Sequence, residues 1–217
     1  MSRPAAARTQ GRPRLVERAE ALARAKELFW SLGYQRASLP TLEAATGLQR
    51  GSLYALFTDK RTLFLEALAL YGDDSWAAMD QLMPPEARRA DIVAWLLDHA
   101  SRAHGRAGAR GCLLVETVVE MGPHDAEIAR RARRIFDGML DRLERALCGA
   151  PDIAVADPVG CARALLAGLE GLRVLGKGGQ TKDQVNRSVS SLVDALLPPR
   201  ILGARASRSH LRVAPKT

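Results

Sequence analysis

TGLQRGSLYALFTDK, residues 46 to 60, predicts two short helices that meet at a tight glycine turn. Gly47 ends the first helix, and Thr58-Asp59 ends the second while capping the helix that follows. The apolar side of the second helix is formed by Leu53, Leu56 and Phe57. Its opposite side is formed by Gln49, Arg50, Ser52 and Ala55. One side is therefore expected to pack on the protein, while the other meets a polar partner.

The residues upstream predict one long helix and the start of a short one. Apolar positions recur with a helical period from about residue 14 to residue 32, where Gly33 ends the pattern. Ser38 then caps a short helix, since its hydroxyl can accept a bond from an unpaired amide and Pro40 falls within the first turn. Three helices whose last two are joined by a glycine turn form a helix-turn-helix arrangement, and the final helix of such a unit lies in the major groove of DNA.

Several side chains of this unit suit contacts to DNA. Arg50 is expected to pair with guanine and Gln49 with adenine, because each side chain offers two hydrogen-bonding atoms in one plane. Tyr54 and Lys60 are expected to contact phosphates and so fix the register. The predicted DNA-binding residues are Ser38, Thr41, Gln49, Arg50, Gly51, Ser52, Tyr54 and Lys60.

The rest of the chain predicts further helices and no strand ladder. The expected fold class is all-α, with an N-terminal three-helix helix-turn-helix module joined to a C-terminal helical domain. A helix from Lys60 to about Leu82 links the two parts and stops at Pro84-Pro85. CLLVETVVEM, residues 112 to 121, is rich in β-branched residues but lacks a partner strand, so a short helix is expected. The other helices are expected at about 86–104, 126–147, 157–177 and 182–197.

The predicted domains are a DNA-binding domain at residues 14–60, whose linking helix runs to about 82, and a ligand-binding and dimerisation domain at 61–197. Basic flexible tails are expected at 1–13 and 198–217. Residues 1–14 and 200–217 contain nine Lys or Arg residues and no acid, so the net charge of +8 lies outside the body. Such flanks suit arms that meet a polyanion, and solvated, disordered tails are the alternative.

The composition is that of a globular protein, with 47% apolar and 26% charged residues. No apolar run approaches the roughly 20 residues that span a bilayer, and no secretory signal follows the N-terminal arginines. Three cysteines at wide spacings fit reduced thiols better than a disulfide framework. The expected location is therefore the cytoplasm, with association with the nucleoid when DNA is bound.

The stretch AKELFWSLGYQRASLPTLEAATGLQRGSLYALFTDKRTLF, residues 25 to 64, resembles the DNA-binding module of TetR/AcrR-type transcriptional regulators. The resemblance rests on Ala25, Leu28, Phe29, Gly33, Tyr34, Ser38, Leu42, Ala44, Gly47, Gly51, Leu53, Tyr54, Phe57, Lys60 and Leu63. It implies an all-helical homodimer that binds a near-palindromic operator. It also implies a C-terminal domain that binds an inducer and dimerises through its last two long helices.

Three positions depart from the family's pattern. Family members often have Ser or Thr where Gln49 stands, capping the recognition helix, and an aromatic residue or His where Leu56 stands, touching phosphate. Glu43 occupies a position that is usually small and apolar. The family's phosphate contacts are carried over to Tyr54 and Lys60, whereas its base preference is not.

The expected function is that of a repressor released from its operator by a small-molecule inducer of unknown identity, with the signal passing through the helix that begins at Lys60. Three glycines are expected on the dimer face, namely Gly168, Gly171 and Gly176. The inducer cavity is expected to be lined by Trp76, Met79, Trp95, His99, Cys112, Met121, Phe136 and Met139, with plain core packing as the alternative for each.

Cys112 supports an alternative function, a thiol sensor of electrophiles or oxidants in the same family. Arg106, Arg110 and a helix N-terminus after Gly111 would lower the pKa of its thiol, whereas a buried thiol would be inert. No catalytic motif is found, so an enzyme is not expected, although an enzyme or ligand carrier on the same helical frame is a third hypothesis. The histidines lack metal-ligand spacing, and no metal or cofactor is expected.

Overall fold

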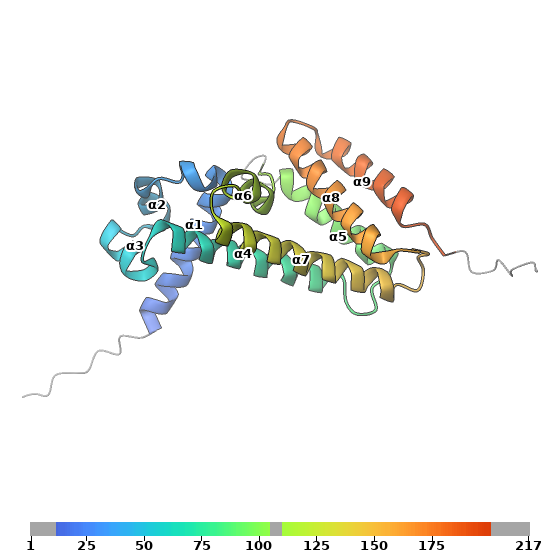
Figure 1. Ribbon diagram of the computed structural model, residues 1–217, viewed down its shortest axis with the longest axis horizontal. Helices are drawn as coiled ribbons and strands as arrows, with labels where there is room; N and C mark the ends of the chain where they lie inside the picture. The colour runs from blue at the N-terminus through green and yellow to red at the C-terminus, as the bar shows by residue number, and fades with distance from the viewer. Residues whose placement is uncertain (1–11, 105–109, 201–217) are drawn as a thin grey trace, which may run out of the picture.

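The computed structural model describes residues 12–104 and 110–200, and this part of the chain is built almost entirely from α-helices (Figure 1). In chain order the elements are α1 (Arg12–Arg36), α2 (Leu39–Thr46), α3 (Arg50–Phe57), α4 (Lys60–Leu82), α5 (Arg89–Ser101), the 3-10 helix η1 (Arg102–His104), α6 (Leu113–Met121), α7 (Ala126–Gly149), α8 (Pro158–Lys177) and α9 (Lys182–Leu196). Within the described residues, extended pairing is limited to an isolated bridge between Ile153 and Pro199. The all-α class expected from the sequence is confirmed.

Helices α1, α2 and α3 form a small unit at one end of an elongated molecule (Figure 1). Gly33 has a φ of 76° and ends the regular part of α1, because residues with a side chain are strained in this conformation. Ser38 caps α2 through its side-chain oxygen, and Gly47 ends the helix. The large buried side chains of the unit and the start of α4 include Phe29, Leu42, Leu53, Phe57 and Phe64.

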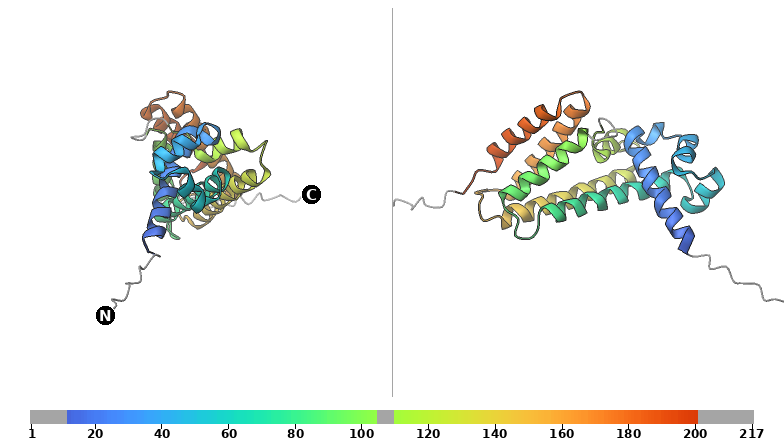
Figure 2. Two further views of the ribbon diagram at one scale, coloured as in Figure 1. Left: turned by 90° about the vertical axis from the view of Figure 1, so that its left-hand side faces the viewer. Right: turned by 180° about the vertical axis from the view of Figure 1, so that it is seen from behind.

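Helices α4 and α7 lie side by side along the body (Figure 2). Two glycines bring them close together. A Cβ atom at Gly72 would lie 2.8 Å from Ile135, and one at Gly138 would lie 2.7 Å from Trp76. Trp76 also donates its Nε1 hydrogen to the carbonyl oxygen of Ile135 at 3.1 Å. Since so little space separates the helices, α4 cannot slide along α7 without repacking these contacts.

Helices α8 and α9 pack on each other and on α5, and α8 also packs on α7. A Cβ at Gly168 would lie 2.9 Å from Leu192 of α9, and one at Gly176 would lie 3.0 Å from Ala103. Both glycines therefore serve close packing within the chain, and the expectation that they lie on a dimer face is wrong. At Gly171 no described atom lies within 4 Å of the added Cβ, so this position faces outward.

The helix boundaries agree with the sequence-based expectations to within a few residues, and CLLVETVVEM forms α6 with one flanking residue. The expected helix at 86–104 is divided into α5 and η1. The part of the predicted loop at 105–109, which includes Arg106, and the parts of the predicted tails at 1–11 and 201–217 lie outside the described residues. Among the residues that are described, none of the helices is long and apolar enough to cross a membrane.

Candidate nucleic-acid interface

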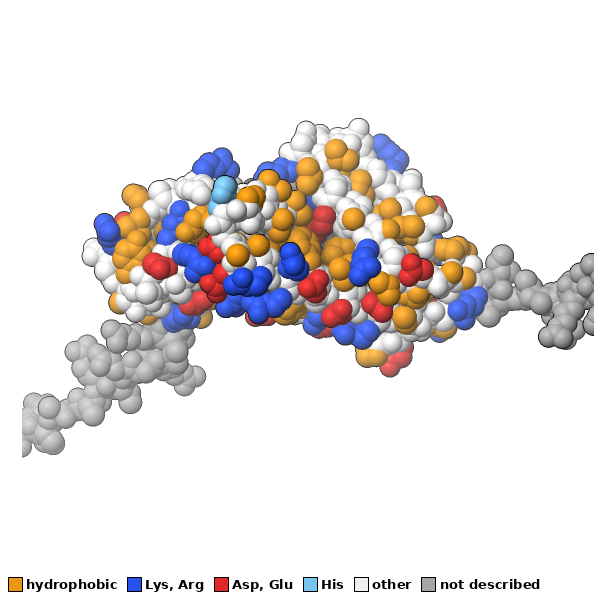
Figure 3. All heavy atoms as spheres, viewed as in Figure 1, with side chains coloured by type: hydrophobic (Ala, Val, Ile, Leu, Met, Phe, Trp, Pro, Cys, Tyr) orange, Lys and Arg blue, Asp and Glu red, His pale blue; other side chains and the backbone are white. Residues whose placement is uncertain are grey.

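Helix α3 presents a polar face at the free end of the small unit. Leu53 and Phe57 are each 1% exposed and anchor the helix. The guanidinium carbon of Arg50 lies 5.7 Å from the ring centroid of Tyr54, which restrains a long side chain. In Figure 3 this end of the molecule carries basic and acidic side chains among hydrophobic and uncharged polar ones. The exposed residues at the start of α3 are Gln49, Arg50, Gly51 and Ser52, and they supply the cationic, polar and small groups that base edges and phosphates require.

The turn between α2 and α3 is tied together by one side chain. The carboxylate of Glu43 accepts a hydrogen bond from the backbone N–H of Arg50, with Oε1 at 2.5 Å from the nitrogen. Gln49 stands at the N-cap of α3, and its own side chain makes no capping bond. The acceptor at the start of the recognition helix therefore comes from α2.

Ser38 and Thr41, two other residues predicted to contact DNA, form hydrogen bonds with each other. Ser38 Oγ accepts a bond from the backbone N–H of Thr41 at 3.4 Å, and Thr41 Oγ1 donates to the carbonyl oxygen of Ser38 at 2.7 Å. The ammonium of Lys60 lies 4.4 Å from the ring centroid of Tyr34. Burial lowers the pKa of Lys60, and the charge of Glu120 acts against this shift. Lys60 is thus a restrained cation at the edge of the small unit.

The segment that includes α6 contacts the small unit at both of its ends. Before α6, the carbonyl oxygen of Gly111 accepts the Nε1 hydrogen of Trp30 in α1 at 2.9 Å. At the end of α6, the carboxylate of Glu120 accepts bonds from the backbone N–H groups of Tyr34 and Gln35, at 2.9 and 2.8 Å. These bonds link α6 and Gly111, which precedes it, to α1, on both sides of Gly33.

A third contact joins the start of α7 to the start of α4. Arg61 donates two bonds to Asp125, at 2.7 and 3.0 Å, and one to Glu127 at 2.8 Å. The hydrogen bond from Arg61 holds the pKa of Asp125 down, at about 2. These contacts tie α6 and its flanks to α1 and to the start of α4, and α1 also packs directly on α4, so α4 and the segment around α6 both form the seam between body and small unit.

A buried polar cluster lies behind this seam. Arg173 is fully buried, and its Nη2 donates to the carbonyl oxygen of Gly111 at 3.0 Å, the same atom that accepts from Trp30. Arg173 Nη1 lies 2.8 Å from His99 Nε2, and Glu170 Oε1 lies 2.9 Å from that nitrogen. Burial, with the charge of Arg173, lowers the pKa of His99. Burial alone would raise the pKa of Glu170, but its hydrogen bond with His99 and the charge of Arg173 outweigh this and lower it.

The cluster has two hydrogen-bonding arrangements. A neutral imidazole nitrogen either carries a hydrogen or accepts one. Nε2 of His99 therefore either donates to Glu170 or accepts from Arg173, and the other neighbour is left unpaired at that nitrogen. Within the described residues, Glu170 Oε2 and Arg173 Nε are also buried without a hydrogen bond, although Oε2 lies 3.6 Å from Arg173 Nη1. Unpaired polar atoms in such a buried cluster are costly, because the surrounding dielectric is low.

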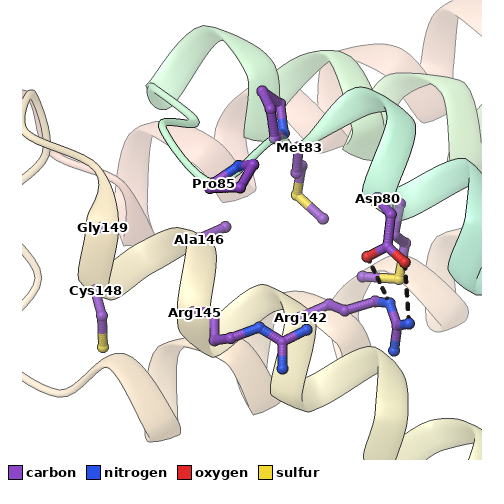
Figure 4. Close-up of a pocket in the computed structure, with 10 residues that line it drawn as sticks. Asp80, Met83, Pro85, Arg142, Arg145, Ala146, Cys148 and Gly149 are labelled. Atoms are coloured by element: carbon purple, nitrogen blue, oxygen red, sulfur yellow. Dashed lines mark hydrogen bonds and ion pairs between the residues drawn. The ribbon is translucent and has the colours of Figure 1, made fainter.

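Cavities adjoin α7 on the side of α4 and on the side of α8. One, of about 650 Å³, lies between the ends of α4 and α7 (Figure 4). It is lined by Met79, Asp80, Met83, Pro84, Pro85, Arg142, Arg145, Ala146, Cys148 and Gly149, and Asp80 accepts two bonds from Arg142 at its rim. A smaller one, of about 270 Å³, is bounded by α6, α7 and α8. Its lining residues are Val115, Phe136, Leu140, Arg163, Leu166, Ala167 and Glu170.

The eight residues predicted to line an inducer cavity are not brought together in either space. Met79 lines the larger cavity and Phe136 the smaller. Trp76 is half-buried between α4 and α7. The others are buried in the core, namely Trp95, His99, Cys112, Met121 and Met139.

Cys112 does not have the environment of a reactive thiol. It is 1% exposed at the N-cap of α6, and the hydroxyl of Tyr71 lies 3.8 Å from its sulfur. Burial, together with the negative charge of Glu170, raises the pKa of Cys112 to about 12. The environment is that of the buried, inert thiol, and the alternative in which nearby cations lower its pKa fails, because desolvation and a buried carboxylate outweigh the charge of Arg173. Arg110, one of those expected cations, instead pairs with Glu27.

The sequence did not predict the residues that connect the small unit, α6 and the buried cluster. They are Trp30, Arg61, Glu120, Asp125, Glu170 and Arg173. Glu170 and Arg173 carried a signal, because they interrupt the apolar pattern of LLAGLEGLRVL three residues apart. Charged residues at otherwise apolar helix positions are seldom fully buried unless they are paired. For Trp30 and Glu120 no local signal exists, since their partners lie 81 or more residues away in the chain.

Comparisons with known proteins agree with this geometry. Residues 21–67 match the sequence model described as bacterial regulatory proteins, tetR family. The chain is 32% identical over 143 residues to an uncharacterized HTH-type transcriptional regulator, YezE of Bacillus subtilis (strain 168), covering 65% of this chain and 74% of that protein. It is 28% identical over 143 residues to the HTH-type transcriptional repressor ComR of Escherichia coli (strain K12), covering 65% and 68%. A cysteine mutant of the TetR family regulator CifR, solved with a 26-bp double-strand operator DNA, superposes with a TM-score of 0.71 and 26% identity, covering 90% of this chain and 100% of that one.

Proposed function

This chain belongs to the TetR family of transcriptional regulators, and on that premise we propose that it is a repressor that binds its operator as a homodimer and is released by a small molecule. As a member of this family it is a DNA-binding transcriptional regulator and not an enzyme. The observation that carries the proposal is the exposed start of α3, where Arg50 stands on a helix anchored by buried Leu53 and Phe57. Residues 14–60 read DNA in this proposal, and residues 61–197 bind the effector and the second subunit.

In the proposed complex, α3 lies in the major groove. Arg50 and Gln49 read base edges, Ser52 and Gly51 allow close approach, and Tyr54 contacts phosphate. Ser38, Thr41 and Lys60 flank the groove and set the register through the backbone. Two such helices about 34–36 Å apart would reach successive turns of one face of the duplex.

The second subunit is proposed to pack on α8. Its outward face carries Gly171 beside Val174 and Leu175, whose exposed fractions are 51% and 48%. Exposed apolar side chains around a small residue suit close helix packing, since burying them removes apolar area from water. In this proposal the open space at Gly171 receives the second subunit, whereas Gly168 and Gly176 pack within the chain.

The proposed effector site is the smaller cavity, which α6, α7 and α8 share. Glu170 forms part of its wall and also contacts His99. A molecule in the cavity would therefore contact one member of the buried cluster of His99, Glu170 and Arg173. Arg173 leads from that cluster to Gly111 and hence to Trp30 in the small unit. The volume of about 270 Å³ and the mostly apolar walls favour a small, apolar effector. Release then follows if the effector prefers a position of α6 that spoils the spacing of the two recognition helices.

The thiol-sensing alternative has less support. Cys112 is buried and its raised pKa disfavours the thiolate that reacts with electrophiles. A titration of operator binding against an electrophile, in wild type and Cys112→Ser, would distinguish the two mechanisms. A response that disappears in the variant would favour the thiol sensor.

The proposed function is tested by nuclease protection of the DNA upstream of the chain's own coding region. The wild type should protect a near-palindromic site. Arg50→Ala should relax sequence preference at one base pair per half-site, whereas Lys60→Ala should weaken binding uniformly and reduce the salt slope by about 1. Arg187→Ala, an exposed arginine of α9, is the matched control and should bind like wild type. Wild-type binding by both Arg50→Ala and Lys60→Ala would show that α3 is not the reading helix.

A further inference from the structure

The recognition helix lacks a cap of its own. Helix α3 has eight residues, Arg50–Phe57, and a helix of two turns is unstable unless its ends are satisfied. Ser, Thr, Asp and Asn are the usual N-cap residues, because their short side chains reach the free N–H groups of the first turn. Gln49 holds the N-cap position with extended backbone angles, φ −71° and ψ 156°, and its side chain makes no such bond.

Glu43 supplies the missing acceptor from the preceding helix. Its backbone carbonyl accepts the N–H of Gly47, which closes α2 at 2.9 Å. Its carboxylate reaches across the turn and accepts the N–H of Arg50, the first residue of α3. Glu43 therefore accepts hydrogen bonds from the backbone on both sides of the turn. These two bonds set where α3 starts relative to α2.

We propose that Glu43 is a positioning residue for DNA recognition, acting as an external N-cap that replaces the one Gln49 does not provide. The proposal rests on the proposed role of α3 as the reading helix. A smaller apolar side chain at position 43 would leave the turn unfastened.

The bond acts on the residue that is proposed to read bases. The backbone of Arg50 is held by Glu43, and its guanidinium lies over the ring of Tyr54. Both ends of the Arg50 side chain are thus restrained before DNA arrives. Without Glu43, the first turn of α3 would have to be ordered on binding, and this cost would lower affinity and base discrimination together.

Variants at positions 43 and 49 test whether Glu43 acts by positioning α3 or by its negative charge. Glu43→Gln keeps an acceptor oxygen at the same reach and removes the charge, whereas Glu43→Asp keeps the charge on a side chain about 1.5 Å shorter. Positioning predicts that Glu43→Gln binds like wild type, and that Glu43→Asp and Glu43→Ala weaken binding about fivefold for each helix engaged. Gln49→Ser supplies a conventional cap but also removes a proposed base contact, so the double variant is compared with Gln49→Ser alone. Adding Glu43→Ala should weaken binding much less there than in wild type. Glu17→Ala removes an exposed acid of the same unit and is the charge-matched control.

The assay is equilibrium binding to a duplex that the wild type enriches from a random pool, compared with a scrambled duplex of the same composition. Thermal unfolding of each variant sets a temperature at which all are folded. We expect a lower ratio of selected to scrambled affinity in Glu43→Ala than in wild type, and a much smaller loss when Glu43→Ala is added to Gln49→Ser. Wild-type binding by Glu43→Ala, tighter binding by both Glu43→Ala and Glu43→Gln, or an equal loss in the Gln49→Ser background would overturn the proposal. If the wild type enriches no sequence, the proposed function fails before any variant is measured.

Discussion

The buried cluster makes a sharp prediction for stability through Arg173→Met. Methionine fills much of the volume of arginine but removes the guanidinium, which is fully buried and bonded to His99 and Gly111. Glu170, only 7% exposed, would then be an uncompensated buried charge. Breaking one side of a buried ion pair costs about 3–5 kcal/mol. For a chain of this length that corresponds to a fall in Tm of about 10 °C.

The double variant tests whether the cost comes from the orphaned charge. In Glu170→Met/Arg173→Met both charges are gone, and replacing a buried pair by apolar residues is often close to neutral, so most of the lost stability should return. Urea unfolding at one protein concentration, followed by far-UV circular dichroism, measures the free energy of unfolding in each variant. Arg187→Met, an exposed control, should change it by about 0.5 kcal/mol or less. A loss under about 1 kcal/mol in Arg173→Met, or a double variant less stable than either single one, would refute the reasoning.

Three further predictions concern packing, pH and thiol access. Gly72→Ala should cost about 1–3 kcal/mol in a calorimetric scan, because the added Cβ would lie 2.8 Å from Ile135; an unchanged Tm would mean that α7 moves aside freely. Burial lowers the pKa of His99 from 6.5, so the unfolded chain binds a proton that the folded chain resists, and stability should fall as the pH drops below about 6.5. His99→Gln should flatten that slope in urea titrations, and an identical slope would assign it to other groups. In the native protein, Cys148 is exposed and should account for a fast phase of labelling by a thiol reagent, whereas Cys112 should react only on unfolding; Cys148→Ser removes the fast phase if this is correct.

The helices were predictable because their signals are local. The apolar period, Ser38 as a cap and Pro84-Pro85 as a stop define elements within a few residues of each other. The linking helix starts and ends at Lys60 and Leu82, as the sequence predicts. Gly168 shows the limit of local signals. A small residue permits close packing, but the sequence does not identify whether the neighbour is α9 or a second subunit.

The candidate site was predictable only in part, because some of its features depend on contacts between residues that are distant in the sequence. Exposure of Arg50 and burial of Phe57 follow from their places on one short helix. Glu43 stood out in the sequence as a departure from the family's pattern, but its role depends on a side chain crossing a turn to a residue seven positions later. The thiol environment of Cys112 depends on Glu170 from another helix, so nearby cations in the sequence gave the wrong direction for its pKa.

The contacts within the small unit are stronger than its hydrogen bonds to the segment around α6, and this difference fits the proposed mechanism. The small unit is held together by a buried apolar core that includes Phe29 and Phe64, so it moves as one body. Its described hydrogen bonds to the segment around α6 are few and mostly part-buried, and each is worth only about 0.5–1.5 kcal/mol, or somewhat more where a charge takes part. A shift of α6 that strains two or three of them changes the energy by about 1–3 kcal/mol, the range that couples an effector site to a DNA site. In the proposed mechanism, a shift of α6 therefore re-aims the small unit without distorting α3, and the packing of α1 on α4 has to adjust with it.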